Sequence, residues 1–134
     1  MDVENFADRV VKILSAVGFR RIVSPNDLVD AWAAFVSECE DGYGWDIYEY
    51  RNELALRDAI ADLLDSEELA RYAEFGGFQA RTAQLDERFK AVLAGGPDVL
   101  GEGSPWWRRR IPGRAGAEFV QDAKAQFGVE LQVE

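Results

Sequence analysis

Apolar residues recur at helical spacing through most of this chain, and that spacing most narrows the folds it can adopt. The clearest run is Phe6, Val10, Ile13, Leu14 and Val17, at positions i, i+4, i+7, i+8 and i+11. Residues at these positions share one face of an α-helix, so the run predicts a helix with one buried side. Similar runs later in the chain predict an all-α, mainly helical protein.

Capping residues and glycines divide the chain into six predicted helices with short connections. Ser24 followed by Pro25 is typical of a helix start, and Gly128 is typical of a helix end. The pairs Gly76-Gly77 and Gly95-Gly96 are also interpreted as helix ends. The predicted helices cover residues 3–17, 25–40, 45–65, 67–75, 78–94 and 115–127, within one compact domain of residues 1–134.

Three segments fit the helical pattern less well. Residues 98–116 are rich in glycine and proline, which predicts an irregular loop. Residues 129–133 alternate in polarity and could form a short edge strand. Residues 45–50 are rich in aromatic side chains and could also form a strand. We favour a helix there, because no turn signal separates them from Asn52.

The absence of histidine restricts the chemistry open to this chain. It removes Ser-His and Cys-His pairs, histidine acid–base catalysis and nearly every zinc or non-haem iron site. Cys39 is the only cysteine, so it can form neither an intrachain disulfide nor an iron–sulfur cluster. We interpret it as a small buried residue at a helix end. The sequence therefore predicts no catalytic residue, no metal ion and no cofactor.

Paired carboxylates are the exception. Glu49 and Glu53 are four residues apart, as are Asp58 and Asp62. Such pairs share a helix face and can hold Mg²⁺ in helical hydrolases of phosphorylated small molecules. At about 100° per residue, however, the two pairs point to opposite sides of one helix and cannot bind the same ion. A Mg²⁺-dependent hydrolase is kept as an alternative function.

A second question is whether Glu49 and Glu53 are buried or exposed to solvent. Glu49 and Glu53 fall on the apolar stripe of the C-terminal half of the same predicted helix. If that stripe stays buried, both carboxylates need partners, and Arg57 is the obvious one for Glu53. If burial ends near Leu56, both are solvated. The sequence leaves the two arrangements open.

The net charge of −10 argues against binding to nucleic acid or to anionic membranes. Nearly all of it lies between Glu38 and Glu68, where eleven carboxylates meet two arginines, a balance of −9. A negative field attracts basic partners, and tyrosine and tryptophan supply contact area. The alternative is a solvated acidic face with its aromatic residues buried in the core. The predicted partner-binding residues are Tyr43, Trp45, Asp46, Tyr48, Glu49, Tyr50 and Glu53.

A second candidate lies within the predicted loop. Its residues are Trp106, Trp107, Arg108, Arg109 and Arg110. They could bind phosphate or stack on bases. We favour a structural role, in which the tryptophans pack on the helices and the arginines pair with the acidic helix.

The segment from Tyr43 to Tyr50, with the acids after it, resembles small acidic bacterial immunity proteins such as the helical colicin nuclease immunity proteins. The resemblance lies in composition and placement, covers less than a quarter of the chain and includes no shared motif. It implies a non-enzymatic inhibitor of a basic protein, such as a nuclease toxin. A structural homodimer is a further alternative. The start of the chain lacks the basic and apolar regions of a secretory signal, and no apolar run approaches ~20 residues, so we expect a cytoplasmic protein.

Overall fold

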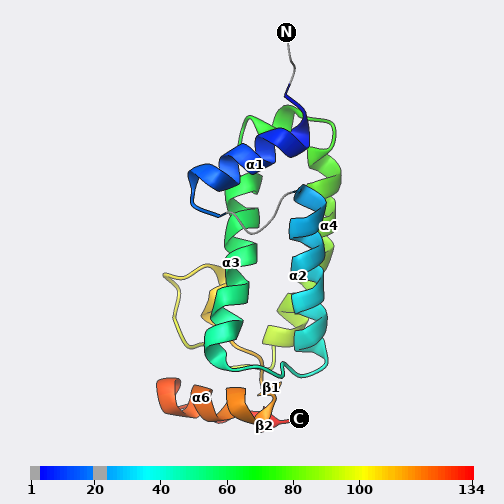
Figure 1. The fold of residues 1–134 in the computed structure, drawn as a ribbon. Helices are drawn as coiled ribbons and strands as arrows, with labels where there is room; N and C mark the ends of the chain where they lie inside the picture. Colours follow the sequence, from blue (N-terminus) through cyan, green and yellow to red (C-terminus); the bar gives the residue numbers. More distant parts are fainter. Residues whose placement is uncertain (1–3, 20–23) are drawn as a thin grey trace.

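The computed structural model, which describes residues 4–19 and 24–134, is mainly helical, as predicted (Figure 1). Six α-helices and one short 3₁₀ turn, η1, lie within the described residues, together with two strands of two residues each. The elements are α1 (Phe6–Ala16), α2 (Pro25–Glu40), α3 (Ile47–Leu64), η1 (Leu69–Arg71), α4 (Phe75–Leu93), α5 (Trp106–Arg109), β1 (Arg114–Ala115), α6 (Ala117–Phe127) and β2 (Gln132–Val133).

Side-chain caps fix where the first three helices begin. The side chain of Asn5 accepts a hydrogen bond from the Asp8 amide at 2.8 Å, so α1 starts at Phe6. The predicted start of this helix at residue 3 lies outside the described residues. Ser24 caps α2 as predicted. Each cap satisfies an amide that has no partner inside its helix, which stabilises the helix by about 1 kcal/mol.

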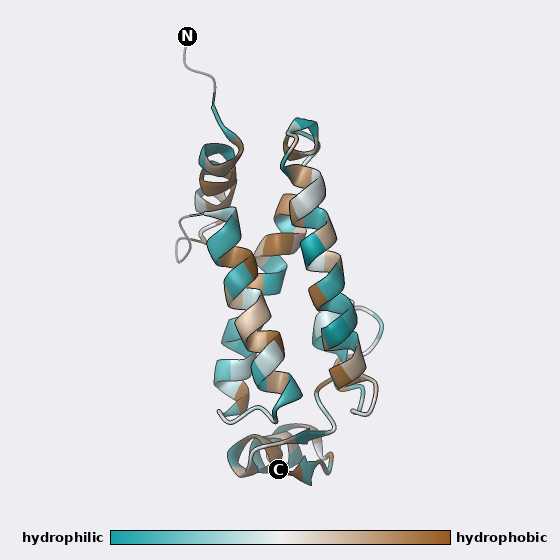
Figure 2. Cartoon of the chain, turned by 90° about the vertical axis from the view of Figure 1, so that its right-hand side faces the viewer, coloured by the Kyte–Doolittle hydropathy of each residue, from teal (hydrophilic) through white to brown (hydrophobic). Residues whose placement is uncertain are grey.

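Helices α2, α3 and α4 run alongside one another, while α1 lies across one end and α6 across the other (Figure 1). Figure 2 shows hydrophilic and hydrophobic residues interleaved along the long helices, as expected where one side of a helix is buried. One apolar cluster contains residues from α1, α2, α3, α4 and α6. None of the helices in the described ranges is both long and apolar enough to cross a membrane.

Aromatic rings form the centre of this core. The Phe35 ring lies 5.5 to 5.6 Å, centroid to centroid, from the rings of four neighbours. Those neighbours are Trp32, Tyr43, Tyr50 and Phe89. Their tilted and edge-on arrangements are the ones that aromatic pairs prefer. Cys39 is also buried in the last turn of α2, which confirms its interpretation as a core residue.

The predicted helix at 67–75 is wrong. Only η1 forms between residues 67 and 74, and α4 starts at Phe75, three residues earlier than predicted. Gly76 and Gly77 therefore lie inside the first turn of α4 rather than at a helix end. Burial of Phe75 and Phe78 on one side of this turn outweighs the low helix propensity of the glycines between them.

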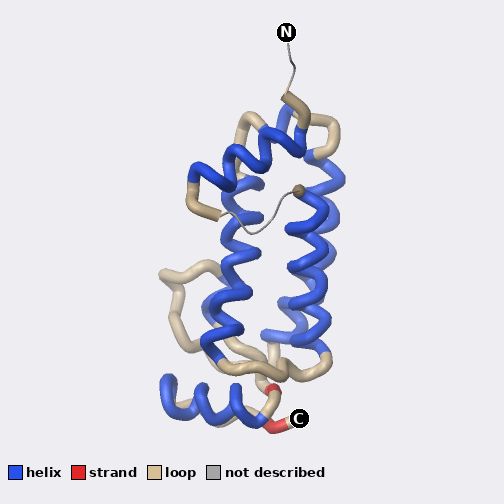
Figure 3. The backbone as a smooth tube through the Cα atoms, in the orientation of Figure 1, coloured by secondary structure: helices blue, strands red, loops and turns tan. Residues whose placement is uncertain are grey.

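The segment after α4 is largely irregular, as predicted, but it contains α5 and β1 (Figure 3). Of the predicted strand at 129–133, only β2 (Gln132–Val133) forms, and it pairs with β1 in parallel. Because β1 includes Ala115, helix α6 starts at Ala117 rather than at Ala115. The chain crosses itself closely here, since a Cβ at Gly96 would lie 1.6 Å from the Ile111 carbonyl oxygen. Glycine is therefore required at position 96.

Candidate functional site

Two of the seven predicted partner-binding residues are not at the surface. Tyr43 is 0% and Tyr50 is 1% exposed, so both side chains lie in the core rather than on the predicted contact surface. The helical phase of α3 explains Tyr50, which shares the inner side of the N-terminal half with Ile47 and Leu54. Tyr43 precedes α3 and packs edge-on against Tyr50 at 5.5 Å.

The remaining predicted residues lie where α2 ends and α3 begins. Trp45 and Tyr48 are 60% and 62% exposed. The structure adds Glu38, from the last turns of α2, which is not among the predicted binding residues. Glu38, Trp45, Glu49 and Glu53 line an open cavity of about 450 Å³, which we call the acidic aromatic groove. Tyr48 is exposed beside it, in the first turn of α3.

Asp46 sets the orientation of this groove. Its carboxylate accepts a hydrogen bond of 2.8 Å from the Glu49 amide and so caps α3. The cap fixes the phase of the first turn, so that Ile47 points inward while Tyr48 and Glu49 stay exposed. Asp46 was predicted as a partner contact, and the structure gives it this positioning role.

Two carboxylates of the groove have no ion-pair partner among the described residues. In residues 4–19 and 24–134, neither Glu38 nor Glu49 forms an ion pair. Glu53 is half-buried and accepts a hydrogen bond of 2.7 Å from the Tyr43 hydroxyl. Burial, together with this carboxylate, raises the pKa of Tyr43 and keeps its hydroxyl protonated. The groove is therefore a negatively charged surface with a wall formed by Trp45.

The two buried tyrosines should respond differently to loss of the hydroxyl. Tyr43→Phe removes a hydrogen bond to a charged acceptor and should lower the free energy of unfolding by about 1.5–3 kcal/mol. The Tyr50 hydroxyl is buried with no hydrogen-bond partner among the described residues, so Tyr50→Phe should be neutral or stabilise by up to about 1 kcal/mol. Urea unfolding of both variants measures the difference. Equal destabilisation would contradict this assignment.

Arg57 is not the partner of Glu53, contrary to one of the predicted alternatives. It is buried and binds Asp86 of α4 with two hydrogen bonds, Nε to Oδ1 at 3.0 Å and Nη2 to Oδ2 at 2.9 Å. The Trp32 indole donates to the same Oδ1 at 3.3 Å. Sequence reasoning missed Asp86. The sequence clue to Asp86 is its place next to Leu85, on the side of α4 that is buried.

Residues 106–110, which we call the tryptophan–arginine loop although α5 forms most of it, divide into two groups in the structure. Trp107 donates its indole N–H to Asp58 Oδ1 at 2.8 Å, and the Arg108 guanidinium makes two hydrogen bonds to the same carboxylate. The Arg57 guanidinium carbon lies 4.3 Å from the centroid of the Trp107 ring. Trp107 and Arg108 therefore hold the loop against α3, as the structural interpretation predicted. They leave the acidic aromatic groove uncovered.

The carboxylates proposed for Mg²⁺ do not converge. Asp58 is bound by Trp107 and Arg108, while Asp62 is separate from Glu49 and Glu53 along α3. The pKa of Asp62 is raised by desolvation and by the nearby charges of Asp58 and Asp65. In the described part of the chain, no group of three or more carboxylate, cysteine or histidine side chains is arranged to hold a metal ion.

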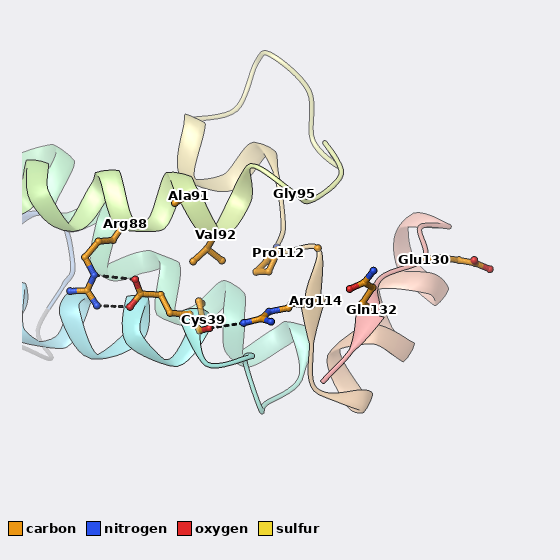
Figure 4. Close-up of a pocket in the computed structure, with 11 residues that line it drawn as sticks. Cys39, Arg88, Ala91, Val92, Gly95, Pro112, Arg114, Glu130 and Gln132 are labelled. Carbon is orange, nitrogen blue, oxygen red and sulfur yellow. Dashed lines mark hydrogen bonds and ion pairs between the residues drawn. The ribbon is translucent and has the colours of Figure 1, made fainter.

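A larger cavity of about 590 Å³ lies between the ends of α2 and α4 and the two strands (Figure 4). Arg88 lines it and is held by Glu40 through Nε at 3.1 Å and Nη2 at 2.5 Å. Arg114 donates to the Glu40 carbonyl at 3.2 Å. Burial raises the pKa of the Cys39 thiol, which therefore stays protonated and unreactive. The charged groups of this cavity are thus already paired within the fold.

Comparisons of this chain with protein-family models, with curated proteins and with solved structures found no match.

Proposed function

We propose that this chain is a non-catalytic, immunity-type inhibitor that acts in the bacterial cytoplasm by binding a basic protein, such as a toxin. The observation that carries the proposal is the acidic aromatic groove. It combines an exposed tryptophan with carboxylates of which two, Glu38 and Glu49, have no ion pair among the described residues. Tryptophan and tyrosine are enriched among the residues that contribute most to binding energy at protein interfaces.

The groove suits a lysine or arginine side chain of the partner. Such a cation could pair with Glu49 or Glu38 while its aliphatic stem or guanidinium packs on the Trp45 ring. Trp45 and Tyr48 would be the residues of largest energetic effect, since truncation of an anchoring aromatic commonly costs 2 kcal/mol or more. Inhibition would follow from steric cover of the partner's own basic site.

The charge of the segment also predicts how binding depends on salt. Seven carboxylates between Glu38 and Glu68 form no ion pair among the described residues, so their field should attract a basic partner over several ångströms. They are Glu38, Asp41, Asp46, Glu49, Asp62, Asp65 and Glu67. Salt shortens the range of this field from about 8 Å at physiological ionic strength to about 3 Å at 1 M.

Affinity capture from cells of the native host, repeated at low and at high salt, tests the proposal. We expect a basic protein to be enriched at low salt and released as the salt concentration rises toward about 1 M. Enrichment of no basic protein, or capture that salt leaves unchanged, would contradict the proposed function.

A further inference from the structure

Part of the tryptophan–arginine loop faces away from Asp58 and forms a second cavity with α4. Its volume is about 340 Å³, and we call it the basic groove. Its lining residues are Lys90, Leu93, Ala94, Trp106, Arg109 and Arg110. Three cations thus meet around an apolar floor, on a protein whose net charge is −10.

The cations of the basic groove are weakly compensated. Arg110 is exposed and forms no ion pair within the described ranges. The Arg109 guanidinium approaches Asp98 only to 3.7 Å, and its Nε is buried without a hydrogen-bond partner among the described residues. Lys90 lies 3.4 Å from Glu87, a pair on the exposed surface of α4. Unused donors of two guanidinium groups therefore remain near the groove.

Trp106 shapes the kind of ligand that this groove can take. The Lys90 ammonium lies 4.9 Å from the ring centroid, and the Arg57 guanidinium carbon lies 5.8 Å from it. Phe89 and Trp107 pack at 6.2 and 5.7 Å. With these neighbours, the ring serves as an apolar wall rather than as an open platform for stacking a base.

We propose that the basic groove binds the phosphate group of a small phosphate monoester. A phosphate dianion accepts several hydrogen bonds at once and matches the planar fork of arginine, which Arg109 and Arg110 both offer. Leu93, Ala94 and Trp106 would contact a small organic substituent. The cavity is near the lower end of the roughly 300–1,000 Å³ range of ligand pockets, which fits a ligand of this size. A nucleic acid is disfavoured because the protein as a whole would repel a polyanion.

Isothermal titration calorimetry at constant ionic strength tests this site, with inorganic phosphate and phenyl phosphate as probes. We expect both to bind with millimolar or stronger affinity, and phenyl phosphate to bind more tightly because its ring contacts the apolar wall. Arg109→Gln and Arg110→Gln should each weaken both probes by about 10-fold. Arg71→Gln, which removes the same charge from an exposed position on η1, should leave both affinities unchanged.

Four outcomes would overturn the proposal. They are absence of heat for both probes, equal weakening in the Arg71→Gln control, unchanged affinity in Arg109→Gln and Arg110→Gln, and no preference for phenyl phosphate over the inorganic ion. Arg110 is exposed, so its variant should fold normally, and circular dichroism checks this directly. None of these results bears on the acidic aromatic groove, which is built from different residues.

Discussion

Replacing Asp86 with alanine is expected to lower the free energy of unfolding by about 3–5 kcal/mol, because it leaves a buried charge without a partner. Asp86 accepts two hydrogen bonds from Arg57 and one from the Trp32 indole. All three groups lie in the interior, where water cannot replace the lost acceptor. Arg57 also contacts the Trp107 ring, so the variant should loosen the loop as well as the polar link between α3 and α4.

Two further variants distinguish the effect of breaking the buried Arg57–Asp86 pair from the effect of breaking an exposed ion pair. Asp30→Ala breaks the exposed ion pair with Arg81 and should cost less than about 1 kcal/mol. The double variant Arg57→Met, Asp86→Leu removes both buried charges and should recover much of the loss. Urea unfolding measures all three. If Asp86→Ala were no more destabilising than Asp30→Ala, the buried pair would not have the structural role assigned to it.

The second large effect is expected for Phe35→Ala, at about 3–5 kcal/mol of destabilisation. Phe35 is 1% exposed, and its ring has four aromatic neighbours. Truncation removes the contacts at the centre of the core and leaves a cavity. The four rings that contact Phe35 belong to three different helices and to the turn before α3, so the loss affects the packing of all of them.

Tyr48→Ala is the matched control for Phe35→Ala. It also truncates an aromatic residue to alanine, but Tyr48 is 62% exposed, and its loss should change stability by no more than about 0.5 kcal/mol. Thermal or urea unfolding of the two variants gives the comparison. A similar change in both would show that the aromatic cluster around Phe35 is not the centre of the core.

Helical periodicity predicted most of the fold because most helices here bury one continuous face. Helix α3 is different, since it contacts α1, α2, α5 and α6. Ile47 and Tyr50 are buried near its start, and Leu56 and Ile60 are buried further along on a side about 130° away. A single stripe extrapolated back from Leu56 passes through Glu49, but that side of α3 is exposed near its start, which agrees with the predicted alternative in which burial ends near Leu56. Which neighbours surround a helix is tertiary information that its own sequence does not carry.

The capping pattern held more information about the candidate site than the aromatic composition did. Asp46 and Glu49 have the spacing of an N-cap residue and the third helical residue. If Asp46 is interpreted as the N-cap, the helical phase of α3 follows, and it places Tyr50 on the buried side and Tyr48 on the exposed side. The partner of Arg57 could not be predicted in the same way, because Asp86 is 29 residues away on another helix.

The proposed function rests on the acidic aromatic groove as the surface that a basic partner contacts. Its direct test is the affinity of the captured partner for the double variant Trp45→Ala, Glu49→Gln, measured by calorimetry against the wild-type protein. A control variant, Leu100→Ala, Glu102→Gln, removes one exposed apolar side chain and one exposed carboxylate from the loop after α4. We predict that the groove variant weakens binding by about 30-fold or more, while the control stays within about 2-fold. A partner that binds the groove variant as tightly as the wild type would contradict the proposed function.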